Sequence, residues 1–272
     1  ETEVVGIPRR QMTIRQLLIA VGTSSNLVEY AKQTVRDYDA LIAAGPVAEN
    51  TTKPESAFEW EKADAAVRTI AHWVPVSRQA VDDALQLQGL IDSELRYGLE
   101  FVEEDQLLNG TGVGQQLNGL LGEAVDFNPA FTLDPNTNQQ VDSLRLMLLQ
   151  VALAEYPADG IVINPIDWAK IELLKDGQER YLFSNASSLT GPRLWSLPVI
   201  STQGMVENYA LVGAFRMAAT IYDRMGTEVL ISSEDQDNFV KNMLTVRAEK
   251  RLALAVKRPT ALVTGELLPI ST

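Results

Sequence analysis

The stretch SRQAVDDALQLQGLIDSELRYGLEFVEEDQLL, residues 77–108, organises the chain because it predicts one unbroken helix. Ser77 is a candidate N-cap, and Asn109 with Gly110 is typical of a helix end. Apolar residues recur at steps of mostly three to four along one side: Val81, Leu85, Ile91, Leu95, Leu99 and Val102. At 1.5 Å per residue this helix would be about 48 Å long, which predicts a spine along which an elongated subunit packs.

The composition is that of an acidic globular protein of one or two domains. The chain has 272 residues, a net charge of -13 and no cysteine. The acidic balance argues against a basic surface that wraps nucleic acid, and the lack of cysteine excludes disulfides and thiolate chemistry. No run of 18 apolar residues is present, and charged residues interrupt the spine helix, so we expect no membrane span.

The single histidine restricts the chemistry further. A Ser-His-Asp site could use only His72, which lies in the apolar stretch VRTIAHWVPV, where a buried structural imidazole is favoured. One histidine without cysteine also argues against the usual zinc sites. The Gly-rich stretch NGTGVGQQLNG, residues 109–119, follows a helix and lacks the Lys-Ser/Thr of a phosphate-binding loop. We therefore expect no metal and no cofactor.

The N-terminal part predicts an arm and a ribbon. Residues 1–27 show no pattern of an independent core and are expected to lie on another surface. The stretches 27–42 and 58–76 flank a tip rich in turn-forming residues, residues 44–56, and together predict a long β-hairpin. A two-stranded ribbon alone is marginal in water, so this hairpin indicates obligate assembly with a partner surface.

The C-terminal half predicts a mixed α+β unit followed by long strands. Helices are expected from Asp142 or Ser143 to Glu155 and from Pro165, with Asn164 as N-cap, to Asp176-Gly177. Strands are expected at residues 160–164, 180–183, 197–202, 209–212 and 217–222, and antiparallel strands over 227–267. The basic residues Lys250, Arg251, Lys257 and Arg258 are interpreted as a solvated face or an intersubunit charge match, rather than a nucleic-acid contact.

Several short blocks carry a family resemblance when taken together. They are MTIRQLL, TSSN, KPES, VRTIAHWVPVSRQ, LLNGTGVGQQLNGL, GIVINPIDW, DNFVKNMLT, RLALA and RPTA, in order from Met12 to Thr264. In these blocks the chain resembles the major capsid protein of the Hong Kong ninety-seven type of tailed bacteriophage.

The resemblance implies an α+β, Hong Kong ninety-seven-like capsid fold with four parts. It implies an N-terminal arm (1–27), a long β-hairpin called the extended loop (28–75) and an inserted axial domain (121–223). The remaining part is a peripheral domain, made of the spine helix part (76–120) and C-terminal strands (224–272).

The resemblance also implies a structural protein and not an enzyme. Hexamers and pentamers would form an icosahedral bacteriophage head around double-stranded DNA, without sequence-specific contact and without a membrane. The expected partners are other copies, a portal, a maturation protease and, in some shells, cement proteins. The protein would reside in the virion after assembly in the host bacterial cytoplasm. The start Glu1-Thr2-Glu3, without Met, fits removal of an N-terminal segment by that protease.

Some members of this family join their subunits covalently. A lysine on the extended loop attacks an asparagine side-chain amide of a neighbouring subunit, ammonia leaves, and a glutamate is the base. The resemblance places these roles on Lys53 of KPES, Asn242 of VKNM and Glu249. Only the neutral amine attacks, so an apolar pocket is needed to disfavour the cation. Val47 and Met225 are candidates for that pocket.

The spacing of the candidate residues bears on which subunits supply them. Asn242 and Glu249 are seven residues apart, which is roughly 23 Å on a straight strand, with side chains on opposite faces. They could not serve one lysine from a single strand, so we expect Lys53, Asn242 and Glu249 at one site to come from different subunits. Arg247 would share a strand face with Glu249, and pairing between them would weaken Glu249 as a base.

Three alternatives remain open. An encapsulin-type bacterial nanocompartment shell shares the fold. Copurifying DNA or a copurifying cargo enzyme would decide between a phage head and such a compartment. A soluble amidase or transferase using Lys53 and Glu249 would require turnover by isolated monomers. A ligand-binding module would remain monomeric at micromolar concentration.

Overall fold

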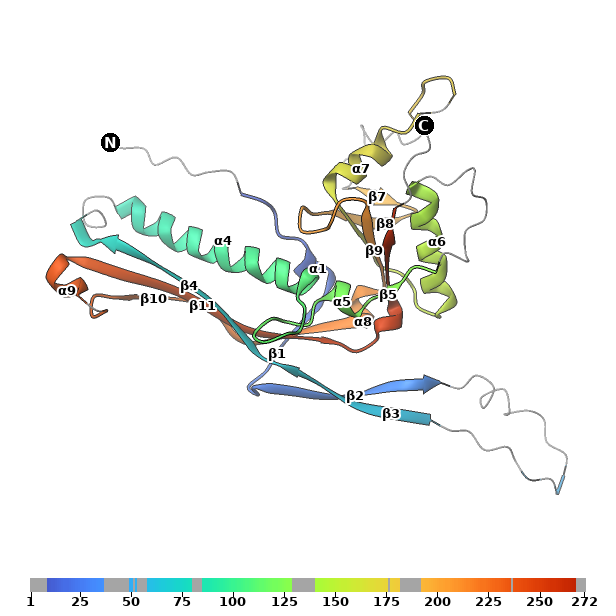
Figure 1. Ribbon diagram of the computed structural model, residues 1–272, viewed down its shortest axis with the longest axis horizontal. Coiled ribbons are helices and arrows are strands. Elements are labelled where there is room, and N and C mark those ends of the chain that lie inside the picture. Colours follow the sequence, from blue (N-terminus) through green and yellow to red (C-terminus); the bar gives the residue numbers. More distant parts are fainter. Residues whose placement is uncertain are drawn as a thin grey trace.

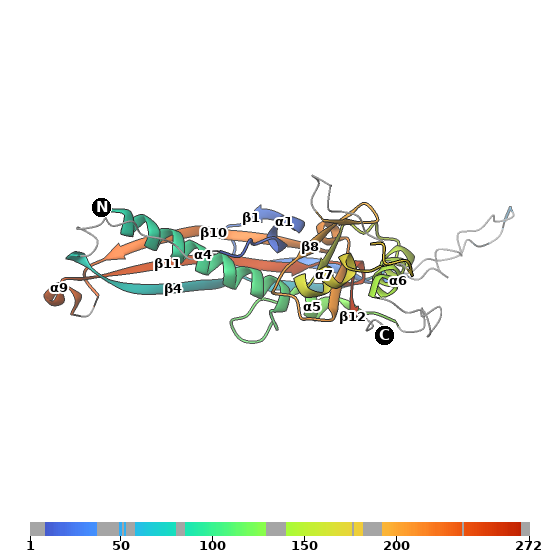
Figure 2. The ribbon, with the colours of Figure 1, turned by 90° about the horizontal axis from the view of Figure 1, so that it is seen from above.

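The structure is a computed structural model, and it describes residues 9–36, 49–50, 52, 58–79, 85–128, 140–175, 177–181, 192–235 and 237–267. The body is elongated, and a two-stranded ribbon projects from it (Figure 1). Helix α4 (Leu85–Asn109) lies along a four-stranded sheet, and a six-stranded sheet stands beyond the C-terminal end of the helix (Figure 2). With 25 residues, α4 is about 37 Å long, so the predicted spine is present.

The four-stranded sheet, which we call the long sheet, has α4 on one face. Its strands are, in order, β1 (Ile19–Gly22), β10 (Ala219–Ser232), β11 (Met243–Val256) and β4 (Arg68–Ser77). Strand β11 is antiparallel to both β10 and β4, whereas β1 runs parallel to β10. Under the helix, Leu95 and Leu99 pack on Val246 and Ala248. The opposite face of this sheet is not covered by any helix among the described residues.

The spine helix is predicted to start at Ser77, and the described residues neighbouring this position are partly strand and partly helix. Ser77 is the last residue of β4, where it pairs with Met243, and the helical residues Arg78 and Gln79 follow it directly. Alternate residues of β4 (Ile70, Val74 and Val76 among them) face α4. This two-residue period is that of a strand, and β4 continues to Ser77. Residues 80–84 lie outside the described part. The predicted end at Asn109 and Gly110 is confirmed.

The predicted hairpin is confirmed only in part. Strand β2 (Leu27–Arg36) pairs with β3 (Phe58–Ala66), but the predicted return arm from 58 to 76 is two strands. The Val67 amide donates to the Asn26 carbonyl at 2.9 Å and closes the ribbon, after which β4 enters the long sheet. Burial of the β4 side chains under α4 accounts for the change of sheet, because the ribbon offers no such core.

The six-stranded sheet carries most of the predicted α+β unit. Its order is β5 (Val125–Asp126), β12 (Leu262–Glu266), β9 (Tyr209–Gly213), β6 (Gly160–Ile163), β8 (Leu197–Ser201) and β7 (Arg193–Leu194). Helix α6 (Gln140–Leu153) and helix α7 (Pro165–Glu172) accompany it. As predicted, Asn164 caps α7, since its Oδ1 accepts from the Ile166 amide at 2.9 Å. Helix α7 ends earlier than predicted, at Glu172 instead of Asp176.

Two predicted strands belong elsewhere. The strand expected at 217–222 is the start of β10 in the long sheet, preceded by the short helix α8 (Phe215–Ala218). The last C-terminal strand, β12, follows a 3-10 turn (Pro259–Ala261) and pairs with β9. Both placements follow from burial. Ile221 of β10 enters the core between the two sheets, and Val263 of β12 enters the core of the six-stranded sheet. Of the strand expected at 180–183, the described part shows one bridge, between Tyr181 and Lys175.

The described part of the predicted arm packs on α4 and β10. Helix α1 (Ile14–Leu17) and strand β1 follow an extended start at Arg9, and Ile14 and Leu17 enter the core beside Leu107 and Phe215. Among the described helices, none is long and apolar enough to cross a membrane.

The single histidine holds β4 against α4. His72 Nε2 lies 2.8 Å from the Leu95 carbonyl oxygen, and a Cβ built on Gly98 would lie 2.5 Å from His72 Cε1. This contact supports the structural interpretation of His72.

We expect Gly98→Ala to destabilise the fold by about 1–3 kcal/mol through overpacking, although alanine favours a helix. Gly89→Ala is the matched control in the same helix, because a Cβ there meets nothing within 4 Å. Its expected effect is a gain of up to about 1 kcal/mol. Denaturant unfolding of the two variants checks this, and equal stabilities would contradict it.

Candidate functional site

Asn242 lies at the tip of the long sheet, between the short helix α9 (Asn238–Lys241) and β11 (Figure 1). Its backbone is left-handed, with φ 55° and ψ 40°, a conformation that asparagine tolerates better than most residues. The Asn242 carbonyl accepts from the Arg78 amide at 2.9 Å, which fixes the backbone. The side chain is exposed, so its amide is available to a second molecule.

Two large apolar side chains lie uncovered beside Asn242. Phe239 is 82% exposed and Val240 is 86% exposed, both on α9. Exposed apolar groups gathered at one point are typical of a surface that another molecule covers.

Glu249 lies in the middle of β11, on the face of the long sheet that turns away from α4. It pairs across the sheet with Glu228 of β10, and its neighbours Ala248 and Lys250 are buried on the opposite face. Arg247 Nε is 3.5 Å from Glu249 Oε2, so the pairing predicted from the sequence is confirmed. Both side chains are partly open to solvent, and the Glu249 carboxylate can be reached from outside.

Met225 lies on the same side of the sheet as Glu249. The register places Met225 opposite Arg251, two residues from Glu249, next to an irregularity in β10. The structure thus brings Met225 and Glu249 to one face. Val47 and Lys53 lie outside the described residues.

The chain does not bring Asn242 and Glu249 together. Strand β11 runs without a break from Met243, so these two side chains are roughly 23 Å apart along the strand. One subunit therefore presents an amide at the tip and a carboxylate along the face. The site that joins all three candidate residues is not assembled within the described part of a single chain.

Sequence reasoning missed a buried ionic network at the C-terminal half of α4. Glu103 and Glu104 are only 3% and 2% exposed. Glu104 accepts from Arg10 Nη2, from Thr202 Oγ1 at 2.7 Å and from the Thr13 amide at 2.6 Å. Burial by itself would raise the pKa of Glu104, but the hydrogen bonds from Thr202, Arg10 and the backbone amides outweigh it and hold that pKa below its ordinary value.

Glu103 forms the second half of this network. It accepts from Lys250 Nζ at 2.5 Å and from Arg15, which also contacts Asp223 of β10. The network ties the arm, the spine helix and both long strands together. A signal was present in the sequence, because Glu103 continues the four-residue steps of Leu95 and Leu99 on the buried stripe.

The predicted basic cluster is not one solvated face, because Lys250 is buried whereas Arg258 is exposed. Lys250 is buried under α4, Lys257 Nζ donates to the Tyr222 hydroxyl at 2.9 Å, and Arg258 donates to the Met217 carbonyl at 2.9 Å. Each cation therefore has its own partner within the chain. Over the described ranges there is no group of three or more His, Cys, Asp or Glu that could hold a metal ion.

Comparison with known proteins places this geometry in a family. The Phage capsid family matches residues 1–267. The major capsid protein of Enterobacteria phage HK97 is 45% identical over 256 residues, which cover 94% of this chain and 65% of that protein. The chain thus spans about 65% of the length of this relative.

Solved structures agree at the level of the fold. The capsid of an empty GTA particle matches with a TM-score of 0.77 and 17% identity, over 99% of this chain and 95% of that chain. Mycobacterium phage Bobi matches with a TM-score of 0.77 and 16% identity, over 97% and 93%. The chain belongs to the phage capsid family and has the HK97-like fold. The predicted resemblance and the prediction of a structural protein, not an enzyme, are confirmed.

Proposed function

We propose that this chain is the major capsid protein of a tailed bacteriophage, assembling as hexamers and pentamers into an icosahedral head around double-stranded DNA. The observation that carries this proposal is the 45% identity to the HK97 major capsid protein over 94% of the chain. The ribbon supports it: among the described strands β2 and β3 pair only with each other, and Trp60 on β3 is largely exposed. In this proposal the arm is residues 1–27 and the extended loop is residues 28–75. The peripheral domain is residues 76–120 with 224–272, and the axial domain is residues 121–223.

Electron microscopy of the purified full chain tests the proposal. The expected result is closed icosahedral shells, with nuclease-protected DNA in particles from infected cells. Lone globules at micromolar concentration would overturn it. Shells that contain a cargo enzyme and no DNA would favour an encapsulin-type compartment instead.

We further propose that the assembled shell crosslinks itself. The neutral Lys53 Nζ attacks Asn242 Cγ, a C–N bond forms, and the bond from Cγ to Nδ2 breaks. Glu249 takes a proton from the attacking amine and returns it to the departing group, so that ammonia leaves and Glu249 is regenerated. Water plays no part in the balance, and the reaction occurs once per site.

The geometry of the described residues supports a site shared between subunits. Asn242 and Glu249 are too far apart on β11 to act on one lysine from the same chain, and Lys53 lies on a loop expected to reach a neighbour. Met225 offers apolar surface beside Glu249, and Val47 would add to it from the loop. The reaction therefore depends on assembly and should not occur in isolated subunits.

The apolar pair on α9 leads to a prediction about assembly. We expect the double variant Phe239→Ser with Val240→Ser to fold normally but to raise the critical concentration for shell formation on the order of 10- to 100-fold, because two apolar side chains lose burial in each contact. Light scattering against concentration measures it. Leu153→Ser, an exposed apolar residue of α6, is the matched control, and equal effects of the two variants would contradict a specific role of α9.

A further inference from the structure

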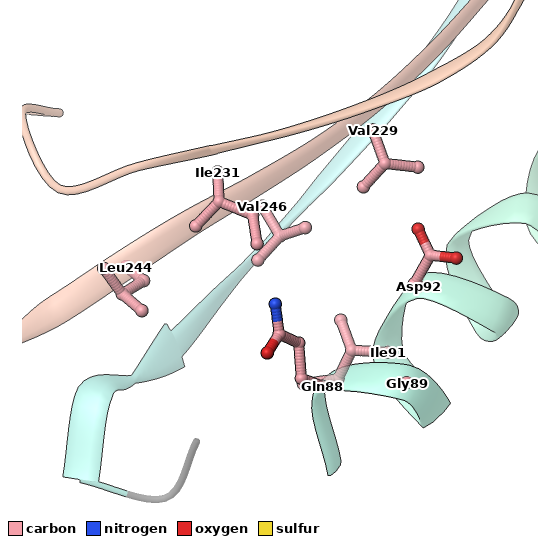
Figure 3. Close-up of a pocket in the computed structure, with 8 residues that line it drawn as sticks. All are labelled: Gln88, Gly89, Ile91, Asp92, Val229, Ile231, Leu244 and Val246. Carbon is pink, nitrogen blue, oxygen red and sulfur yellow. The ribbon is translucent and has the colours of Figure 1, made fainter. Parts of the chain in front are cut away.

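An open groove lies between the first described turns of α4 and the far ends of β10 and β11. Its volume is about 530 Å³. Figure 3 shows the residues that line it. The walls are mainly apolar: Ile91, Val229, Ile231, Leu244 and Val246. The one charged group on its rim, Asp92, is neutralised by Arg96, whose Nε lies 2.8 Å from Asp92 Oδ2. The groove therefore suits an apolar occupant.

The groove is open on the side of β10. Strand β1 pairs with β10 only as far as Asp223, and no described strand pairs with residues 224–232 on that edge. Ile231 is 49% exposed although it points into the groove. An apolar strand edge left in this state is one that proteins usually cover.

The arm leads toward this groove. It runs antiparallel to α4: the Arg10 amide donates to the Tyr97 hydroxyl at 3.0 Å. One residue earlier, Arg9 Nη2 donates to Ser93 Oγ at 2.7 Å. Gly89, on the rim of the groove, is one helical turn before Ser93. From Arg10 to Arg9 the arm therefore runs along α4 toward the groove end of the helix.

The eight residues that precede Arg9 have the reach and the chemistry to fill it. Their sequence is ETEVVGIP, with Val4, Val5 and Ile7 as apolar members. Fully extended, eight residues span up to about 28 Å, whereas the remaining turns of α4 before Ser93 span about 12 Å. We propose that residues 4–7 of the chain's own N-terminal segment occupy this groove and cover the open edge of β10.

Occupation of the groove would stiffen the strand end that presents Asn242. Leu244 forms part of the groove and is only two residues from Asn242. This consequence rests on the proposed crosslinking, but the docking itself does not. A failure of docking can therefore be told apart from a failure of shell assembly.

Because the chain has no cysteine, two introduced cysteines have no native thiol to pair with in a disulfide test. Val5→Cys is combined with Ile231→Cys in the full chain carrying Lys53→Ala, so that no isopeptide bond forms. Mild oxidation of unassembled protein should give an intramolecular disulfide, seen as a faster monomer on a non-reducing gel. The control pair, Val5→Cys with Val113→Cys, places the second thiol beyond the opposite end of α4. We expect at least about tenfold less internal disulfide there.

Two outcomes would overturn the proposal. A disulfide-linked dimer would mean that the segment enters the groove of a second copy. Free thiols in both pairs would mean that the groove is not filled by residues 4–7. If the Ile231→Cys variant does not fold, Ile7→Cys with Gly89→Cys replaces it, because a Cβ on Gly89 meets no neighbouring atom within 4 Å. The same two outcomes then apply.

Discussion

Alanine at Lys53, Asn242 or Glu249 should reduce the covalent ladder of mature particles to a single band at monomer mass. Lys53→Ala removes the nucleophile and Asn242→Ala removes the amide carbon that it attacks, so neither variant can form the bond. Glu249→Ala keeps both reacting groups but loses the general base, which typically contributes 10²- to 10⁴-fold to a rate. Its band should stay single over the time in which wild-type particles crosslink.

Boiled and reduced particles on a denaturing gel measure this, with electron microscopy to show that each variant still forms shells. The chain offers matched controls. Lys62→Ala removes an exposed lysine of the ribbon, and Glu228→Ala removes the carboxylate opposite Glu249. Both controls should retain the ladder. A single band from mature wild-type particles would refute the chemistry and leave the shell proposal standing.

The ion pair between Arg247 and Glu249 gives a finer test of the same site. Arg247→Leu frees the carboxylate and should speed the appearance of the ladder by up to about fivefold, since a partly exposed pair contributes about 0–1 kcal/mol. The time course of gel bands after assembly measures the rate. A slower reaction in this variant would mean that Arg247 helps the crosslink, for example by positioning Glu249.

The sequence predicted the elements whose periodicity is local. The arms of the ribbon, helices α6 and α7, the Asn164 cap and the buried strand β6 all followed from patterns within about 15 residues. Strands β4 and β12 did not, because their positions are decided by distant partners. Strand β4 alternates as a ribbon strand would, and only its pairing with β11 under α4 shows that it leaves the ribbon at Val67.

The candidate site shows the same limit. The motifs KPES and VKNM and the position of Glu249 came from resemblance, and the spacing on β11 correctly predicted that Asn242 and Glu249 stay apart. The burial of the charged residues was harder to predict, because Glu103, Glu104 and Lys250 each resemble an ordinary surface charge when read alone in the sequence. Their burial follows from partners 88 to 147 positions away, which no local pattern contains.

Glu104→Ala should be the most destabilising single change in the described core of α4, at about 3–5 kcal/mol. The substitution leaves Arg10 without its carboxylate partner in a largely buried position, and it leaves the Thr13 amide and the Thr202 hydroxyl without this acceptor. Because Arg10 and Thr13 belong to the arm, the arm should also detach from α4.

Denaturant unfolding of the unassembled Lys53→Ala chain measures this, and hydrogen exchange of residues 9–22 reports the detachment. Glu100→Ala, an exposed residue one turn earlier on α4, is the control, and we expect it to change stability by no more than about 0.5 kcal/mol. Equal effects of the two substitutions would mean that the buried network contributes little.

The pH dependence provides an independent test of the same carboxylate. Hydrogen bonds hold the pKa of folded Glu104 below its ordinary 4.5, so the unfolded chain binds its proton first as the pH falls. The stabilisation is therefore complete above about pH 4.5 and is lost as the pH drops through the lower, folded pKa. Glu104→Gln cannot titrate, so the stability gap between it and the parent should be constant from pH 7 to about pH 5 and should narrow below about pH 4.5. A gap that stays constant down to pH 3 would show that folding does not lower the pKa of Glu104.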